Sequence, residues 1–156
     1  MNGLIVYFSR TGRTRKVAEA IQAATGFDLE EIKEEGGRGG PLGWLKSGME
    51  SIRRMLPKIR PLAHDPSEYD IVVIGTPIWA SNMSSPIRAF IIEHKNNLNK
   101  IALFCTGDGD EPEKVFTPLS ELLGNEPQAT LGLIGSDRKE DIATLKIQVF
   151  AEKLSV

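Results

Sequence analysis

Residues 4–14 read LIVYFSRTGRT, and this stretch decides the fold. Its first half, Leu4–Phe8, is an unbroken run of apolar residues rich in β-branched and aromatic side chains, which is typical of a strand buried on both faces. Its second half is polar and leads into Thr14–Thr25, where apolar residues recur at helical spacing. Gly26 follows at the position where a helix commonly ends. The stretch therefore predicts a buried strand, a polar loop and a helix.

The same alternation of strand and helix continues along the chain. Four further apolar runs of strand length are expected at residues 27–32, 71–74, 101–104 and 131–134. Helical patterns follow from Ser85, over 113–123, and in a final helix that Ser136 or Asp137 is expected to cap. This order predicts a single α/β domain over residues 1–156, with a doubly wound, five-stranded parallel sheet and helices on both faces. Such sheets bind ligands beyond the carboxyl ends of their strands.

Several local boundaries are also predicted. The strand at 71–74 is expected to close at Gly75, and the next helix to begin with Ser85 as its cap and Pro86 as its first residue. Gly124 is expected to end the helix at 113–123. The last helix is expected to bury a stripe made of Ile142, Leu145, Val149 and Leu154.

The composition is that of a globular protein, with 40% hydrophobic and 26% charged residues in a chain of 156. The formal net charge of −2 argues against a polycation that binds nucleic acid. A single cysteine, Cys105, cannot form an internal disulfide and suits a reducing compartment. The first residues have neither a basic start nor an apolar run long enough for a signal peptide or a membrane span. We therefore expect a cytoplasmic protein without nucleic-acid binding or membrane insertion.

One segment, residues 33–70, departs from the regular alternation. Four apolar residues at spacings of three and four predict an amphipathic helix here: Leu45, Met49, Ile52 and Leu56. From Gly36 to Leu62 the chain carries six basic residues and one acidic residue. The basic charge of Arg38–Arg60 fits a solvated helix face, or a docking surface for an acidic partner or an anionic cosubstrate. The apolar stripe fits packing within the protomer or against a second copy of the chain, so it is compatible with a monomer and with a homodimer.

The polar loop Ser9–Thr14 has the composition of a phosphate site. It places three hydroxyl groups and one glycine at a helix N-terminus, where backbone N–H groups and the helix dipole attract anions. An ordinary hydroxyl cap is the plainer alternative, but hydroxyl residues are dense here for capping alone. The Walker triphosphate pattern and the dinucleotide pattern G-x-G-x-x-G are both missing. The loop therefore predicts a phosphate group of another kind of ligand.

Two more loops follow predicted strands. Residues 75–83 read GTPIWASNM, and Trp79 in this position favours stacking on a planar ligand over packing back onto the core. Residues 106–110 read TGDGD, where two glycines permit close approach of the backbone to a ligand. A plain turn fits TGDGD equally well, whereas the twelve-residue calcium loop is absent.

Together these loops resemble those of the flavodoxin family. The resemblance rests on S-x-T-G-x-T after the first strand and on a strand that runs into T-P-x-W before a proline-started helix, and it covers nearly the whole chain. It implies the strand order 2-1-3-4-5 and one non-covalent FMN. The implied cofactor-binding residues are Ser9, Arg10, Thr11, Gly12, Arg13 and Thr14 for the phosphate, Thr76, Pro77, Ile78, Trp79 and Ala80 along one face of the ring, and Thr106, Gly107, Asp108 and Gly109 at the other face and the pyrimidine edge.

The function that the resemblance implies is electron transfer between a reductase and an acceptor protein, with no catalytic residue in the chain itself. One alternative is an NAD(P)H-dependent quinone or FMN reductase on the same fold, which the mild net charge and the basic segment Arg38–Arg60 favour. A second alternative is a flavin-free module that binds a phosphate ligand. In a flavin site, the carboxylates of Asp108 and Asp110 would lower the reduction potential through Coulomb repulsion.

The cysteine and the two histidines give no second candidate site. Cys105 ends an apolar run and is expected to be a small buried hydrophobe rather than a nucleophile. His64 and His94 have no evident acid or nucleophile companion, so no catalytic triad and no metal site are predicted.

Overall fold

The computed structural model describes residues 1–36, 56–109 and 111–156. A parallel sheet forms its centre, made of β1 (Gly3–Tyr7), β2 (Asp28–Glu31), β3 (Ile71–Trp79), β5 (Lys100–Gly107) and β6 (Thr130–Ile134). These strands lie in the order β2-β1-β3-β5-β6, and every neighbouring pair is parallel. The short strand β4 (Asn82–Met83) pairs antiparallel with the end of β3. With β4 set aside, the order 2-1-3-4-5 expected from the sequence is confirmed.

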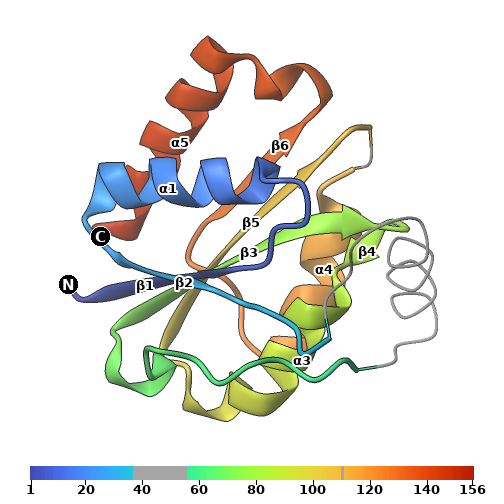
Figure 1. Ribbon diagram of the computed structural model, residues 1–156. Coiled ribbons are helices and arrows are strands. Elements are labelled where there is room, and N and C mark those ends of the chain that lie inside the picture. The colour runs from blue at the N-terminus through green and yellow to red at the C-terminus, as the bar shows by residue number, and fades with distance from the viewer. Residues whose placement is uncertain (37–55, 110) are drawn as a thin grey trace.

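Helices cover both faces of the sheet (Figure 1). The first helix, α1 (Arg13–Thr25), lies beside the last, α5 (Glu140–Leu154), on one face. On the other face lie α3 (Ser85–His94) and α4 (Glu113–Leu123). Short 3₁₀ helices occur at η1 (Pro66–Glu68), η2 (Lys95–Asn97) and η3 (Gly135–Arg138). The amphipathic helix expected from Leu45 to Leu56 lies, apart from Leu56, outside the described residues.

Two apolar layers enclose the sheet because successive strand residues point to opposite faces. The layer under α3 and α4 receives Leu4, Val6, Val72, Ile74, Leu103 and Cys105. The layer under α1 and α5 receives Ile5, Tyr7, Ile71, Val73, Ala102 and Phe104. Burial on both faces explains why the strands read as unbroken apolar runs rather than as alternating ones. At the centre, a Cβ atom on Gly75 would lie 1.9 Å from the ring of Phe104, so only glycine fits there.

The third strand is longer than the sequence predicted. It does not close at Gly75 but continues to Trp79, because Thr76 and Pro77 still pair with Cys105 and Thr106 of β5. The helix that follows is capped by Ser84 rather than Ser85, which is its first helical residue. Ser84 has an extended backbone and donates its N–H to the hydroxyl of Thr76, which fixes the start of α3 one residue early.

The expected helix ends at Gly26 and Gly124 are confirmed, whereas the buried stripe of the last helix is wrong. Neither Ser136 nor Asp137 caps α5, because both lie in the 3₁₀ turn that precedes it. The residues of α5 that face the sheet are Ile147, Phe150, Ala151 and Leu154. Of the predicted stripe only Leu154 is buried, while Leu145 is 62% exposed and Val149 is 44% exposed.

Candidate functional site

The three predicted loops meet at one edge of the sheet, as expected for parallel strands. Register pairing sets Tyr7 of β1 opposite Gly75 of β3, and Pro77 of β3 opposite Thr106 of β5. The chain therefore leaves all three strands at their carboxyl ends on the same side of the molecule. This is the edge where open α/β sheets bind their ligands.

The loop between β1 and α1 forms a helix end that is suited to an anion. The hydroxyl oxygen of Ser9 accepts hydrogen bonds from the backbone N–H of Gly12 at 3.1 Å and of Arg15 at 3.2 Å. Gly12 has a φ of 95° and directly precedes the helix. The N–H groups of Arg13 and Thr14 lie in the first turn, where no carbonyl of the helix can accept them. An anion at this helix end would therefore meet free donors and the positive end of the dipole.

A buried hydroxyl pair joins this loop to the end of β5. The Oγ1 atoms of Thr14 and Thr106 lie 2.9 Å apart, within hydrogen-bond distance. Thr14 is 1% exposed and Thr106 is 4% exposed. The hydrogen bond lies away from water, so it holds the first residues of α1 against the end of β5.

The loop after β3 is a tight hairpin. Trp79 pairs with Asn82 of β4, and the two residues between them form the turn. Ala80 has a φ of 49° and Ser81 a φ of 59°, both in the left-handed region. Two left-handed residues make a type I′ turn, which usually contains Asn and Gly. Ala and Ser in these positions leave the hairpin strained.

Thr76 supports the base of this hairpin. It is fully buried, and its hydroxyl oxygen accepts the N–H of Ser84 at 2.9 Å. The same oxygen lies 2.8 Å from the carbonyl oxygen of Pro77. The interactions of Thr76 thus connect the end of β3 to the start of α3.

Trp79 is half-buried at the end of β3. Its ring meets that of Phe8 edge to face, with the ring centroids 5.3 Å apart and the planes at 87°. Phe8 directly follows β1, so the tryptophan predicted to stack on a ligand contacts the residue that leads from this strand into the predicted phosphate loop.

The remaining predicted residues lie in the same three segments. Arg10 and Thr11 belong to the loop before α1, with Arg10 half-buried and Thr11 exposed. Ile78 is half-buried in β3, and a Cβ atom on Gly107 would lie 3.0 Å from its Cδ1 atom. Ala80 and Gly109 are exposed. Asp110 lies outside the described residues.

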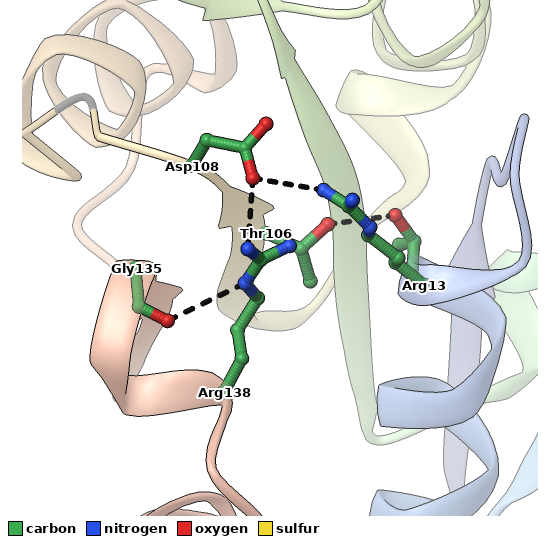
Figure 2. A network of polar contacts seen from close by, with 6 residues as sticks. Arg13, Thr106, Asp108, Gly135 and Arg138 are labelled. Atoms are coloured by element: carbon green, nitrogen blue, oxygen red, sulfur yellow. Dashed lines mark hydrogen bonds and ion pairs between the residues drawn. The ribbon is translucent and has the colours of Figure 1, made fainter.

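The carboxylate of Asp108 is shared by two arginines (Figure 2). Its Oδ1 atom lies 3.0 Å from a guanidinium nitrogen of Arg13 and 2.8 Å from one of Arg138. The Nε atom of Arg138 also donates to the carbonyl oxygen of Gly135 at 3.4 Å. Two guanidinium groups thus offset the negative charge that the sequence analysis expects beside a ligand.

Sequence reasoning missed Arg138, because nothing local connects it to Asp108. The close approach of η3 to the loop after β5 depends on Gly135, which has a φ of 56°. A Cβ atom on this glycine would lie 3.0 Å from the carbonyl oxygen of Asp108. A side chain at this glycine would crowd the backbone of the loop after β5. The loop expected to bracket a ring is therefore held from the side of β6 and α5.

The expectation that His64 has no acidic partner is wrong. Its Nδ1 atom lies 2.7 Å from Glu30, which is 8% exposed. The same carboxylate accepts the backbone N–H of Ala63 at 3.1 Å and of His64 at 3.0 Å. These bonds attach the segment before η1 to β2, so the pair stabilises a loop. Its members lie 34 residues apart, which is why the pattern is invisible locally.

Cys105 is fully buried in β5. Burial, as the main cause, and the negative charge of Glu113, as the smaller one, raise the pKa of its thiol to about 12. A thiol that stays protonated is a poor nucleophile, in agreement with the expectation of a small buried hydrophobe. Among residues 1–36, 56–109 and 111–156, no helix has both the length and the apolar character that a bilayer crossing requires.

Comparison with known proteins gives one family and several related structures. A family model described as Flavodoxin matches residues 2–128. A flavoprotein from Lactobacillus acidophilus, solved in complex with FMN, is 26% identical, with 90% of this chain and 96% of that one covered and a TM-score of 0.71. A candidate flavoprotein from Bacteroides eggerthii is 27% identical, with coverage of 96% and 98% and a TM-score of 0.78. Flavodoxin 1 from Bacillus cereus shares the fold at 15% identity, with coverage of 99% and 98% and a TM-score of 0.60. None of the curated proteins compared with the sequence matches it.

Proposed function

Because this chain belongs to the flavodoxin family, we propose that it binds one FMN non-covalently at the carboxyl ends of β1, β3 and β5 and carries electrons between redox partners. The similar flavoprotein from Lactobacillus acidophilus, which was solved with FMN, supports the choice of cofactor. The partners proposed are a reductase that supplies electrons and a protein that accepts them. The buried, unpaired Cys105 supports the cytoplasm as the location.

The observation that carries the proposal is the hydrogen bond between Thr14 and Thr106. The two hydroxyl oxygens are 2.9 Å apart and buried, and they come from the loop expected to hold the phosphate and the loop expected to hold the ring. A ligand with a phosphate at one end and a planar ring at the other would need these two loops in a fixed relation. The bond supplies that relation before any ligand binds.

The residues present fit the two ends of FMN. The first turn of α1 offers the N–H groups of Arg13 and Thr14 to a phosphate, and Gly12 leaves room at the turn. Trp79 offers an indole ring that Phe8 holds edge-on. Gly107 is half-buried, and the lack of a side chain there leaves room for Ile78, which is also predicted to line the ring. These groups would bind and orient FMN, and electron transfer requires no acid or base among them.

The bound flavin would supply reversible one- and two-electron transfer, and the chain tunes that chemistry. Asp108 would disfavour added negative charge on a ring nearby, but Arg13 and Arg138 offset this effect. The carboxylate and the two guanidinium groups are exposed to solvent, which screens their influence further. We therefore propose that the loop after β5 lowers the reduction potential of the flavin only weakly.

Titration of the flavin-free protein tests the proposal. In a Trp44→Phe background, Trp79 is the only tryptophan, so quenching of its fluorescence reports a ring bound beside it. FMN is expected to quench strongly, and riboflavin, which lacks the phosphate, to bind at least about ten times more weakly. Thr14→Val is expected to weaken FMN about tenfold and riboflavin little, whereas Thr130→Val, an exposed hydroxyl deletion in β6, should change neither. Failure of FMN to quench Trp79 would overturn the proposal.

The reductase alternative stays a prediction. Its main support, the basic segment Arg38–Arg60, lies mostly outside the described residues. Anaerobic addition of NADPH to the FMN-loaded protein separates the two functions. Bleaching of the flavin within seconds, without a separate reductase, would favour the enzyme, whereas slow or absent bleaching favours the carrier.

A further inference from the structure

A cavity lies between α1 and α5, on the face of the sheet that these helices cover. Its volume is about 800 Å³, within the range of small-molecule sites. The lining comes from α1, α5 and η3 and from the ends of β5 and β6. Figure 1 shows the two helices side by side above this part of the sheet. Arg13 and Thr106 line the cavity and also belong to the loops predicted to bind FMN, so the two sites adjoin.

The inner surface of the cavity is apolar. It is formed by Val17, Ala20, Leu133, Ala143 and Ile147. Leu133 and Ile147 are almost fully buried and belong to the core layer under α1 and α5. Ala20 and Ala143 pack against the same layer from the two helices, and their small size leaves the space between the helices open. Burial of an apolar body here would be favourable.

The mouth of the cavity is cationic. Four basic side chains line it, Arg13, Lys16, Arg138 and Lys139, against the single acid Glu140. All four residues are exposed, so none is confined to the interior. This charge contrasts with a chain whose formal net charge is −2. A cationic rim around an apolar pocket selects for an anionic group on an apolar body.

The protein already holds one carboxylate between two of these cations. Arg13 and Arg138 approach the same Oδ1 atom of Asp108, at 3.0 Å and 2.8 Å (Figure 2). The side chain of Asp108 is 76% exposed and lies outside the lining of the cavity. Ion pairs this exposed contribute little to stability, so a better-placed anion can replace Asp108. The two arginines thus form a carboxylate receptor at the edge of an apolar pocket.

We propose that the cavity between α1 and α5 binds a small amphiphilic anion, with an apolar ring or chain against Val17, Ala143 and Ile147 and a carboxylate or sulfonate between Arg13 and Arg138. The ligand competes with Asp108 for these guanidinium groups. This site is additional to the proposed FMN site and does not depend on it. Because Asp108 belongs to the loop after β5, occupancy of the cavity also releases that loop from Arg13 of α1 and Arg138 of η3.

The test uses 1-naphthoate as the probe and methyl NMR of the purified protein, with its FMN content measured beforehand. Titration should shift the methyl signals of Val17, Ala20, Ala143 and Ile147, while the neutral analogue 1-naphthalenemethanol binds at least about tenfold more weakly. Arg138→Gln should weaken naphthoate about tenfold. Lys153→Gln, an exposed cation on α5 that does not line the cavity, should leave the affinity unchanged.

Two further variants separate the proposal from nonspecific attraction. Ala143→Leu fills the space between the helices and should abolish the shifts while circular dichroism and melting stay close to those of the parent. Asp108→Asn removes the internal competitor and should tighten naphthoate binding severalfold. Equal affinity for the neutral analogue, equal weakening by Arg138→Gln and Lys153→Gln, or shifts confined to residues around Trp79 would each overturn the proposal. Binding of FMN in the fluorescence titration is a separate readout, so either proposal can fail alone.

Discussion

The ring of Phe8 contacts the ring of Trp79 edge to face, at a centroid distance of 5.3 Å. Phe8 is 7% exposed and belongs to the core layer under α3 and α4, whereas Trp79 is half-buried. A core residue therefore sets the position of the Trp79 ring at the edge of the sheet where FMN is proposed to bind. Aromatic pairs of this geometry contribute about 0.5–1.5 kcal/mol beyond their buried area.

The first prediction concerns this contact. Phe8→Leu should lower the free energy of unfolding by about 1–2 kcal/mol and shift the emission of Trp79 to longer wavelength in the Trp44→Phe background. Phe27→Leu is the matched control, because Phe27 is also nearly buried but belongs to the layer under α1 and α5. It should lower stability without moving the emission. Equal emission shifts in the two variants would contradict the assigned contact.

The buried hydroxyl pair gives a second prediction. Thr14→Val or Thr106→Val alone leaves one buried hydroxyl without its partner, at a cost of about 1–3 kcal/mol in urea unfolding. The double variant removes both groups and should cost about 1 kcal/mol less than the sum of the single changes. Thr130→Val, which is exposed, should stay within about 0.5 kcal/mol of the parent. Strict additivity would show that the two hydroxyl groups do not interact.

The left-handed hairpin turn predicts a stabilising substitution. Ser81 has a φ of 59°, which glycine adopts without a clash of its side chain, so Ser81→Gly should raise the free energy of unfolding by about 0.5–1 kcal/mol. Ala23→Gly, in the exposed face of α1, introduces the same residue where φ is helical and should lower it by about 0.5–1 kcal/mol. Thermal melting separates the two. A loss of stability with Ser81→Gly would sink the assignment of this turn.

Alkaline pH should destabilise the fold through Cys105. Burial raises the pKa of this thiol from 9.0 to about 12, so between these values the folded chain keeps a proton that the unfolded chain releases. The contribution of this thiol to the free energy of unfolding is therefore fully present below pH 9. It falls as the pH rises above 9, by at most about 1.4 kcal/mol for each pH unit. Tyr69, whose pKa burial and the bond to Asp28 raise from 10.0 to about 12, adds to the loss above pH 10.

Urea unfolding of the parent and of Cys105→Ala checks this pH dependence. The variant should be less stable at neutral pH because it leaves a small cavity, yet it should lose less stability between pH 9 and pH 10. Parallel losses in the two proteins over this interval would exclude the thiol as the cause.

Local patterns in the sequence were enough for most of the fold. Unbroken apolar runs such as Leu4–Phe8 mark strands covered on both faces, and Gly26 and Gly124 mark helix ends. The last helix shows the limit of such patterns. It carries apolar residues on two sides, and the 3₁₀ turn at Gly135–Arg138 fixes which side meets the sheet. The spacing of apolar residues within the helix does not determine which of these two sides faces the sheet.

The candidate site was predictable where its residues follow one another in the chain, as in Ser9–Thr14. Its long-range partners were not. The sequence predicts a loop after Gly75, because glycine commonly ends a strand, yet pairing with β5 extends β3 to Trp79. Arg138 reaches Asp108, and Glu30 reaches His64, across about 30 residues of intervening chain. Such contacts follow from the packing of whole elements, which sequence spacing alone does not encode.

The bond between Asp108 and Arg138 has a consequence for the order of synthesis. Arg138 is made about 30 residues after Asp108, because η3 follows β5 and β6 in the chain. Until η3 has left the ribosome, the loop after β5 lacks this arginine, whereas β1, β3 and the loop Ser9–Thr14 can already assemble. The two loops predicted to bind the two ends of FMN are therefore completed at different stages of synthesis.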